Sequence, residues 1–282
     1  MRLAENQTMN ETDANIANIT NITIGALPAF NDNYIWVLRR GPYVVVVDPG
    51  DAAPVLQYLH ASEGELAAIL ITHHHADHIG GIGGLLGYAG ENIPVFGPDN
   101  VSIPGRNLRL AGGETISVPG IESDLEVIAV PGHTASHLAY YGQSLGPAGA
   151  LFCGDTLFGA GCGRLFEGTP AQMQTSLASL AVLPAPTFVY CAHEYTEANL
   201  RFACAVEPDN AKLVARRDLV TELRAQNKST VPSTLADELA TNPFLRWDAP
   251  SVIAATSARL GRAPADAIET FATIRAWKDE FR

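Results

Sequence analysis

Short apolar runs alternate with turn residues through most of the chain before residue 195, a pattern that predicts β-strands separated by tight turns. Residues 34–40 and 43–51 are two such runs, and the Gly41-Pro42 pair between them predicts a hairpin. Residues 66–72 are almost continuously apolar, which indicates a buried strand. Three later runs follow the same design, and they cover residues 125–130, 149–155 and 187–193.

Helical periodicity is rare before residue 195 and dominant after it. Residues 53–61 and 171–183 space their apolar side chains as amphipathic helices do. The glycine-rich segment 80–87 lacks the G-x-G-x-x-G spacing of a dinucleotide-binding loop, so we interpret it as the start of a tightly packed helix. Beyond residue 195 the β-branched runs stop, and the segments that favour helix are 197–207, 211–227, 233–240, 251–261 and 264–281.

This change from strand-like to helix-like sequence patterns predicts a strand-rich catalytic domain over residues 21–195 and a helical domain over residues 196–282. Residues 1–20 are polar and lack the apolar segment of a signal peptide. We therefore interpret them as a poorly ordered leader, with Met9 as an alternative start. Asn-x-Thr triplets begin at Asn6, Asn10, Asn18 and Asn21, but their glycosylation would require a secreted protein.

Composition and charge narrow the classes of function. Hydrophobic residues make up 47% of the 282 residues and charged residues 17%, which is ample for a core. The net charge of −12 and the pI of about 5.0 argue against a general affinity for nucleic acid or anionic membranes. No apolar run approaches the ~20 residues that cross a bilayer, and the four cysteines show no disulfide pattern. We therefore expect a cytoplasmic monomer without nucleic-acid or membrane partners.

Half of the eight histidines stand close together in residues 71–81, whose sequence is ITHHHADHIGG. Crowded imidazoles repel one another when protonated, and burying so many titratable groups without a cation is costly. The cluster therefore indicates a metal site. Its members are His73, His74, His75 and His78, with Asp77 among them.

Further candidate ligands follow other predicted strands, and the ends of paired strands meet at a common edge of a sheet. The strand at 66–72 leads into the histidine cluster, and the strands at 125–130, 149–155 and 187–193 each lead to one more ligand. Seven nitrogen and oxygen ligands exceed the needs of one tetrahedral zinc, so we expect two ions joined by a bridging oxygen ligand. The seven candidates are His73, His75, Asp77, His78, His133, Asp155 and His193.

Ligand chemistry indicates how some of these residues divide. Imidazole and carboxylate donors without thiolates suit Zn²⁺, Fe or Mn²⁺. His73 and His75 lie on one side of an extended turn and suit one ion, whereas Asp77 and His78 reach its neighbour. Asp155 is the natural bridge, because a carboxylate offers two donor oxygens. Two adjacent ions hold hydroxide at neutral pH and polarise a carbonyl, so we predict a hydrolase with Asp77 and Asp155 as catalytic residues.

Other residues of metal-binding type have simpler explanations. Cys153 and Cys191 are expected to be small buried hydrophobes, because the metal shells are already filled. Cys162 lies in a glycine-rich loop, where we expect it to be more exposed. The remaining histidines for which we expect structural roles are His60, His74 and His137.

The T-H-x-H-x-D-H pattern at Thr72–His78 resembles the signature of the metallo-β-lactamase superfamily, whose fold is an αβ/βα sandwich. Further segments narrow the resemblance to the glyoxalase II family, the hydroxyacylglutathione hydrolases, over residues 24–282. Together with the helical texture after residue 195, this predicts an α/β sandwich with a C-terminal all-helical domain. The segments are LPAFNDNYIW (27–36), PGHTASH (131–137), CGDTLFGAGCGRLFEG (153–168), CAHEYTEANLRFA (191–203) and NPFLR (242–246).

The resemblance also implies a ligand set and a reaction. The cofactors would be two divalent metal ions, with zinc expected first and iron or manganese as alternatives. The substrate would be a thioester such as S-lactoylglutathione, split into a 2-hydroxy acid and glutathione in methylglyoxal detoxification. One ion would be held by His73, His75 and His133, the other by Asp77, His78 and His193, and Asp155 would bridge them.

The same resemblance implies that Arg164, Tyr195, Arg275 and Lys278 bind glutathione, which makes residues 196–282 a substrate-binding domain. Arg164 replaces the lysine of some relatives and changes a point charge into a planar fork. Arg275 and Lys278 share a face of the last predicted helix. Without the resemblance they would be interpreted as cations of an ordinary solvated helix end.

Two other classes of function remain open on the sequence alone. One is another enzyme of the superfamily, such as a lactonase, a single-iron persulfide dioxygenase or a nuclease. The acidic pI argues against a nuclease, and the complete set Asp77, His78 and His193 argues against a single-iron enzyme. The other is a metal-binding protein without catalysis, which would not need the helical domain.

Overall fold

The computed structural model of the protein describes residues 22–99 and 101–281. The polar leader predicted over residues 1–20, with Met9 and three complete Asn-x-Thr triplets, lies outside the described residues. Within the part of the chain that is described, no helix combines the length and the apolar character needed to cross a bilayer.

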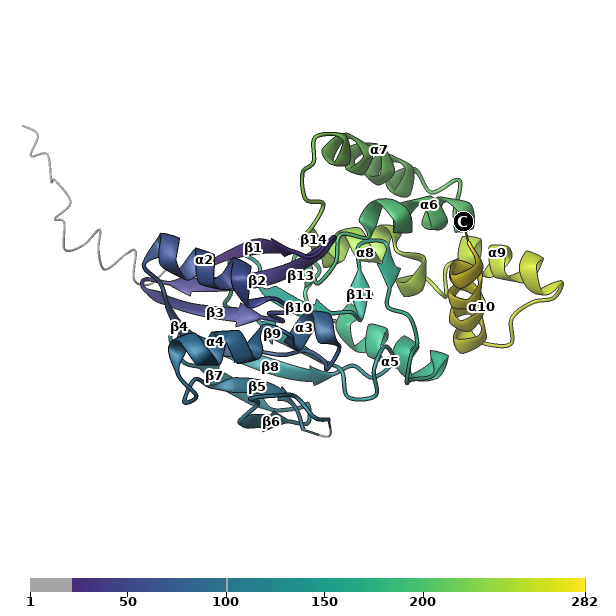
Figure 1. Cartoon of the computed structure of the whole chain (residues 1–282). Coiled ribbons are helices and arrows are strands. Elements are labelled where there is room, and N and C mark those ends of the chain that lie inside the picture. The colour runs from purple at the N-terminus through teal and green to yellow at the C-terminus, as the bar shows by residue number, and fades with distance from the viewer. Residues whose placement is uncertain (1–21, 100, 282) are drawn as a thin grey trace, which may run out of the picture.

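Two mixed six-stranded sheets form a sandwich (Figure 1). The first has antiparallel pairing from β1 to β3 and parallel pairing from β3 to β6. Its strands, in spatial order, are β1 (Thr23–Ala29), β2 (Asn33–Arg40), β3 (Tyr43–Val47), β4 (Glu65–Leu70), β5 (Val95–Pro98) and β6 (Leu108–Leu110). The second runs β14 (Ser233–Thr234), β13 (Phe188–Cys191), β10 (Ala150–Gly154), β9 (Leu138–Gly142), β8 (Ser123–Ala129) and β7 (Thr115–Val118).

Alternating side chains of the first sheet fill two apolar layers, as the period of two in a strand requires. In β3, Val45 and Val47 face the second sheet and belong to the main core. Val44 and Val46 face the other way and pack in a second cluster with residues of two helices. Those helices, α2 (Ala52–Ser62) and α4 (Ile82–Ala89), cover the outer face of the sheet (Figure 1).

Local sequence signals account for the helix starts. The Asp51 side chain caps α2 by accepting a hydrogen bond from the backbone N–H of Ala53. Helix α5 (Pro170–Ala181) begins with a capping box between Thr169 and Gln172, and with proline in its first turn. The predicted hairpin is confirmed, and so are all the predicted helices before residue 195, whose ends differ by one or two residues.

One strand ends earlier than predicted. The strand expected over residues 43–51 ends at Val47, because Asp48 has a φ of 53°, in the left-handed region, and turns the chain. This turn places the Asp48 side chain at the edge of the sheet where β4 also ends. A residue that the sequence assigned to a strand is therefore part of the functional edge.

The C-terminal region is helical and gathers at one end of the sandwich, on the right of Figure 1. Its only strand among the described residues is β14, which extends the second sheet beside β13. A two-residue strand is too short to show a period in the sequence. The helical elements are α6 (Thr196–Val206), α7 (Ala211–Ala225), α8 (Leu235–Thr241), the 3₁₀ turn η1 (Pro243–Leu245), α9 (Pro250–Leu260) and α10 (Ala267–Glu280).

Candidate metal centre and substrate pocket

Loops that follow four strands bring the predicted ligands to one edge of the sandwich. The loop after β4 and the short helix α3 (Ala76–Ile79) carry the histidine cluster. The loops after β8, β10 and β13 carry one ligand each. The structure brings all seven candidates together in two adjoining groups that share this edge. They are His73, His75, His133 and Asp155 in one group, and Asp77, His78 and His193 in the other.

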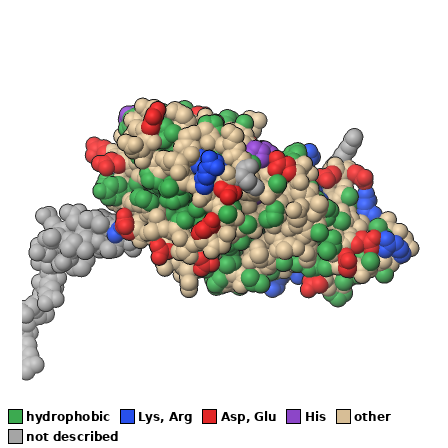
Figure 2. All heavy atoms as spheres, turned by 90° about the horizontal axis from the view of Figure 1, so that it is seen from below, with side chains coloured by type: hydrophobic (Ala, Val, Ile, Leu, Met, Phe, Trp, Pro, Cys, Tyr) green, Lys and Arg blue, Asp and Glu red, His purple; other side chains and the backbone are tan. Residues whose placement is uncertain are grey.

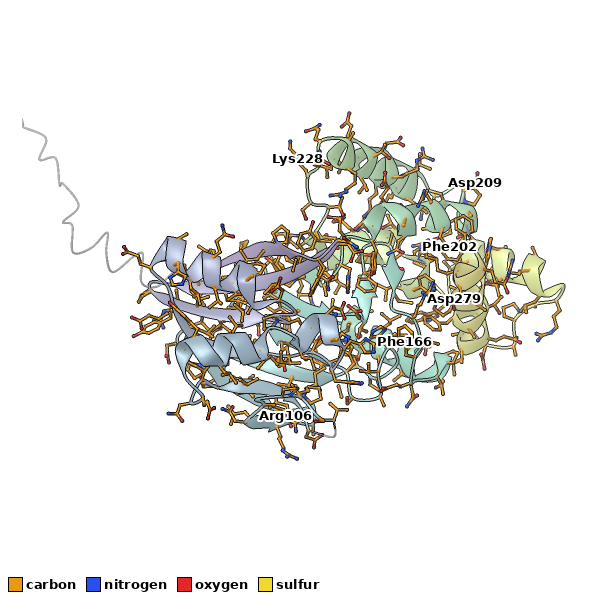
Figure 3. All side chains as sticks on the ribbon, viewed as in Figure 1. Arg106, Phe166, Phe202, Asp209, Lys228 and Asp279 are labelled. Carbon is orange, nitrogen blue, oxygen red and sulfur yellow. The ribbon has the colours of Figure 1, made fainter. Side chains whose placement is uncertain are left out.

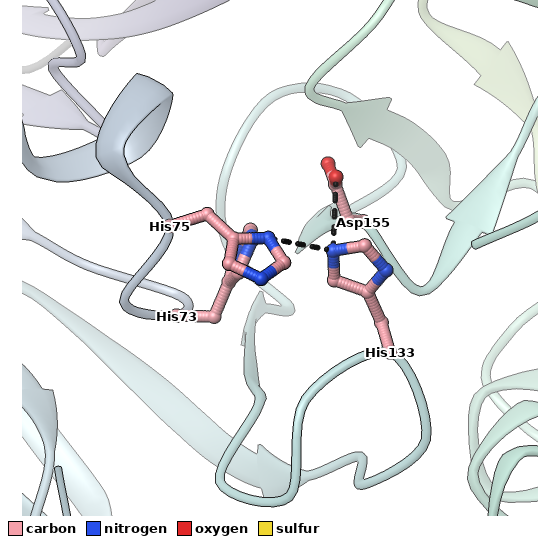
Figure 4. A group of neighbouring side chains, drawn as sticks. All are labelled: His73, His75, His133 and Asp155. Atoms are coloured by element: carbon pink, nitrogen blue, oxygen red, sulfur yellow. Dashed lines mark hydrogen bonds and ion pairs between the residues drawn. The ribbon is translucent and has the colours of Figure 1, made fainter. Parts of the chain in front are cut away.

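The rings of His75 and His133 face each other beside the Asp155 carboxylate, with His73 behind His75 (Figure 4). The Nδ1 atom of His75 lies 3.1 Å from Nε2 of His73 and 3.0 Å from Nε2 of His133. The Oδ2 atom of Asp155 lies 3.3 Å from Nε2 of His133. The donor atoms of this group all lie within 4.8 Å of one another, so a single cation could bind them all.

The other oxygen of Asp155 faces the second group. Its Oδ1 atom lies 3.5 Å from Nε2 of His78 and 3.3 Å from Nε2 of His193. The same two nitrogens lie 3.5 Å and 3.6 Å from Oδ2 of Asp77. Asp155 therefore offers one oxygen to each group, which is the arrangement of a bridging carboxylate.

Two donor atoms on the side of the second group are buried without a hydrogen-bond partner: Nε2 of His78, and Oδ1 of Asp155, which faces that group from the first. Buried polar atoms are almost always satisfied, because each unsatisfied one costs the free energy of its lost hydration. A divalent cation between these atoms would satisfy both. The donor set of imidazole and carboxylate therefore fits a bound metal ion.

Most ligand histidines use their second ring nitrogen for a hydrogen bond that fixes the ring. Such a bond selects the tautomer in which the other nitrogen offers its lone pair to a metal. The contacts to Nδ1 are Asp48 Oδ2 at 3.1 Å for His78, Asp32 Oδ1 at 2.7 Å for His193, Arg164 O at 2.9 Å for His133 and Thr72 Oγ1 at 3.0 Å for His73.

Asp48 is a residue of the candidate metal centre that the sequence analysis missed. Its buried carboxylate accepts hydrogen bonds from the backbone N–H and the hydroxyl of Thr72, both at 2.7 Å, besides its contact with His78. Because Thr72 also contacts His73, one carboxylate orients a histidine of each group. Asp48, His73 and His78 lie close enough to form a third group. The Asp48 oxygens already have three partners, however, so we assign them to orientation.

Burial and neighbouring charges set the protonation of the centre. Burial alone would raise the pKa of the Asp155 carboxyl, but the facing imidazoles of His78, His193 and His133 outweigh it and hold that pKa well below its usual range. Burial and the surrounding imidazoles lower the pKa of His73 well below its usual value. The Asp155 carboxylate is therefore ionised at neutral pH, and His73 is neutral and able to donate a lone pair.

The histidines expected to have structural roles lie outside the metal-binding groups of the described residues. The Nε2 atom of His74 is 3.3 Å from Oε1 of Glu167. His137 is fully buried, stacks on His73 and accepts a hydrogen bond from the backbone N–H of Asp155 at 3.1 Å. His60 is exposed on α2, where it contacts Tyr88.

The cysteines follow the expectations with one exception. Cys153 and Cys191 are buried, and burial raises the pKa of Cys153 well above its usual value and that of Cys191 to about 12. The expectation that Cys162 is more exposed is wrong, since it is 6% exposed. It lies on β12 (Gly161–Cys162) beneath α10, and Arg275 donates a hydrogen bond to its carbonyl at 3.0 Å.

A pocket of about 530 Å³ joins the metal-binding groups to the C-terminal helices. Its floor carries ligands of both groups, and its walls carry the four residues predicted to bind substrate, Arg164, Tyr195, Arg275 and Lys278. Tyr195 stacks on the His193 ring with centroids 4.7 Å apart. The structure therefore places five of the seven predicted metal ligands and all four predicted substrate residues around one cavity.

The two cations of α10 are not those of a solvated helix end. Arg275 is 5% exposed and holds Asp279 Oδ1 at 2.9 Å as well as the Cys162 carbonyl. Lys278 donates to the Ala198 carbonyl at 3.2 Å and lies over the Phe202 ring. Burial, and then the nearby Arg275, lower the pKa of Lys278 to about 8.

Phe166 is a pocket residue to which the sequence analysis gave no role. It is exposed, and its ring meets those of His75 and His133 edge to face, with centroids 5.5 Å and 5.3 Å apart. Figure 3 shows Phe166 near the end of the sandwich and Asp279 on α10. An aromatic wall next to the first metal group suits an apolar part of a substrate.

Comparison with known proteins shows to which family the chain belongs. A model described as metallo-beta-lactamase superfamily matches residues 29–193, and one described as hydroxyacylglutathione hydrolase C-terminus matches residues 194–281. A hydroxyacylglutathione hydrolase of Cupriavidus taiwanensis is 53% identical over 267 residues, which cover 93% of this chain and all of that one. The chain belongs to the hydroxyacylglutathione hydrolase family. A member from Pseudomonas aeruginosa is 54% identical over 263 residues, covering 92% of this chain and all of the relative.

Solved structures agree with this family at the level of the fold. ETHE1 from Myxococcus xanthus superposes with a TM-score of 0.62 at 22% identity, over 90% of each chain. At that identity the likeness shows the fold alone. Membership of the hydroxyacylglutathione hydrolase family therefore confirms the fold class and the enzyme class predicted from the sequence.

Proposed function

We propose that the protein is a metal-dependent thioester hydrolase that cleaves S-(2-hydroxyacyl)glutathione, with S-lactoylglutathione as its substrate, to a 2-hydroxy acid and glutathione. The supporting observation is the shared pocket, in which a carboxylate-bridged pair of ligand groups adjoins three cationic side chains. The relatives named hydroxyacylglutathione hydrolase support the same reaction. Its place in metabolism would be methylglyoxal detoxification.

We infer a dinuclear centre of two divalent ions, with zinc first and iron or manganese as alternatives. His73, His75 and His133 would hold one ion, Asp77, His78 and His193 the other, and Asp155 both. Once bound, such a pair supplies a Lewis acid and a water of lowered pKa. Asp77 and Asp155 are the proposed catalytic residues, because both carboxylates belong to this centre and line the pocket.

The glutathione arm of the substrate carries two carboxylates, which an acidic protein must meet with local cations. The basic side chains on the face in Figure 2 lie in small separate groups among acidic ones. In the pocket, by contrast, Arg164, Arg275 and Lys278 converge beside Tyr195. We propose that these four residues bind the tripeptide, with Arg164 as a planar fork for a carboxylate.

The thiol leaving group needs little protonation by acidic side chains of the protein. A thiol has a pKa of about 8.5, so it departs as a thiolate with little help from a proton donor. The protein's contribution is to hold the acyl group at the ligand edge and the tripeptide against α10. We also propose the division into a catalytic domain over 21–195 and a substrate-binding domain over 196–282, in a cytoplasmic monomer without nucleic-acid or membrane partners.

An assay with S-lactoylglutathione on protein of measured metal content tests the proposed function. We expect rapid hydrolysis, loss of activity on chelation, and recovery when about two equivalents of a divalent ion are restored. A small acyl thioester without glutathione serves as the control substrate and should give a much higher KM. Hydrolysis that survives complete metal removal, or none on fully loaded protein, would contradict the proposal.

A rise in KM above pH 8 is expected for the glutathione thioester. The pKa of Lys278 is lowered to about 8, so its ammonium is present below that pH and is lost as the pH rises through it. A charge-assisted hydrogen bond is worth about 1.5–3 kcal/mol, so KM should rise roughly tenfold or more between pH 7 and pH 9.5. Steady-state kinetics over this range measure the effect.

The variant Lys278→Arg is the matched control for this pH dependence. A guanidinium keeps its proton at all these pH values, so KM of the variant should stay nearly constant. The small thioester should show no rise with either protein. A wild-type KM that does not change with pH, or an equal rise in Lys278→Arg, would show that Lys278 does not bind the substrate.

A further inference from the structure

The turn between β1 and β2 contacts two proposed ligands of the same metal group. Asp32 lies in this turn, and its Oδ1 atom is 2.7 Å from Nδ1 of His193. Asn33 begins β2, and its amide donates a hydrogen bond to Oδ2 of Asp77 at 3.0 Å. Two adjacent residues therefore hold two of the three ligands that belong to the second group alone.

Backbone hydrogen bonds fix this turn to the segment that carries His193. The N–H of Tyr34 donates to the Ala192 carbonyl at 2.7 Å, and the N–H of Glu194 donates to the Asp32 carbonyl at 2.9 Å. Asn33 and His193 form an isolated antiparallel bridge between them. The turn belongs to the first sheet and the His193 segment follows β13 of the second, so these bonds join the two halves of the sandwich at the metal edge.

The conformation of the turn is strained at an exposed residue. Phe30 has a φ of 52°, in the left-handed region that bulky side chains avoid, although its side chain is 60% exposed. Such strain persists where the surroundings determine the backbone, and it concentrates at functional sites. The Phe30 ring and the Asp77 backbone both pack closely against Gly50. Only glycine permits this, because a Cβ there would lie 1.8 Å from the Asp77 carbonyl oxygen and 2.9 Å from the Phe30 ring.

The first metal group is oriented by other parts of the chain. Its His73 contacts the Thr72 hydroxyl, and its His133 contacts the Arg164 carbonyl. Neither partner belongs to the β1–β2 turn. A change at the turn should therefore reach the second group while leaving the ring orientation of the first intact.

We propose that Asp32 and Asn33 are positioning residues that set the metal affinity of the second group separately from that of the first. The inference rests on the proposed dinuclear centre. Asp32 accepts from the Nδ1–H of His193, which leaves Nε2 as the lone-pair donor. Asn33 holds the Asp77 carboxylate with Oδ2 toward His78 and His193. Without either contact the ligand side chain is free to rotate. Metal binding must then also order that side chain, which lowers the metal affinity.

The test compares Asp32→Ala and Asn33→Ala with the wild-type protein by metal titration and native mass spectrometry. Removing an outer hydrogen-bond partner typically weakens metal binding about 10- to 100-fold. We expect that loss for one of the two ions, with the affinity for the other unchanged, so that each variant carries a single ion under limiting metal. Thermal unfolding of the metal-free proteins shows whether the fold is intact.

The matched controls are residues outside the metal-binding groups and outside the substrate pocket. Asp124→Asn removes an exposed carboxylate from β8, and Asn107→Ala removes an asparagine that bonds the backbone of Val95 and Ile93. Both should bind two ions like the wild type, even where Asn107→Ala lowers the melting temperature. This separates a loss of stability from a loss of metal binding.

The outcomes are distinct. Variants that bind both ions with wild-type affinity, or that lose both ions equally, would overturn the role of the turn while the dinuclear centre stands. A wild-type protein that binds fewer than two ions would overturn the proposed centre and this inference with it. Selective loss of one ion in both turn variants, with two ions in the wild type and the controls, supports the proposal.

Discussion

The Asp155→Ala variant is expected to lose thioester hydrolysis and at least one of the two metal ions proposed for the centre. Asp155 faces the first group with Oδ2 and the second with Oδ1, so its removal takes a ligand from both. Even a single preorganised electrostatic partner in an active site is worth about 10²–10³ in rate. We therefore expect kcat/KM to fall by about 10³-fold or more, measured with S-lactoylglutathione alongside metal content.

Variants that touch one group, or neither, make this prediction specific. His75→Ala removes a ligand from the first group alone and should spare the ion of the second, although activity is lost. His60→Ala removes an exposed imidazole of α2 and should change neither metal content nor rate. Full activity in Asp155→Ala would refute the bridged centre, and so would two tightly bound ions in that variant.

The sequence could predict most of the candidate ligands because four of them closely follow strands with a clear pattern. Apolar runs before His73, His133, Asp155 and His193 reveal strands whose ends meet at one edge, and imidazole is distinctive chemistry. The local signal was sufficient because a strand end fixes where a side chain lies to within a few residues. The structure accordingly brings these residues together without exception.

The residues that orient the ligands could not be found in this way. Asp32 contacts His193, and Asp48 contacts His78, across separations of 161 and 30 residues. A lone aspartate beside a turn has the ordinary signature of a loop, and its partner becomes known only when the sheets are packed. Asp48 directly follows the apolar strand that ends at Val47, as the candidate ligands follow theirs. The predicted strand over residues 43–51 included it, so its position at a strand end was not recognised.

The burial of side chains beneath the C-terminal helices also could not be predicted from the sequence. The burial of Arg275 and Cys162 gives no local signal, because an arginine on a final helix and a cysteine in a glycine-rich loop are usually exposed. Their burial comes from α10 lying over β12, and 113 residues separate the two side chains. Long-range packing of this kind leaves no period in either segment, so the burial of these two side chains could not be predicted, although the fold class could.

A buried carboxylate connects the helical region to the hairpin that precedes Arg164. Glu238 of α8 is fully buried, and its Oε1 accepts from Arg216 at 2.5 Å and from Ser233 at 2.7 Å. Its Oε2 accepts from the backbone N–H of Ala160 at 2.8 Å and from Asn242. Ala160 has a φ of 53° at the turn between β11 (Leu157–Phe158) and β12, so the carboxylate stabilises a strained backbone.

Glu238→Ala is therefore expected to lower the free energy of unfolding by about 3–5 kcal/mol, the usual cost of leaving a buried charge without its partner. Here that charge is Arg216, whose side chain is mostly buried. Urea denaturation of the metal-free protein measures the change. The double variant Arg216→Met with Glu238→Leu removes both charges and should recover part of the loss, because well-packed apolar groups replace buried pairs at little cost. Wild-type stability in Glu238→Ala would show that neither the ion pair nor the Ala160 contact holds the hairpin.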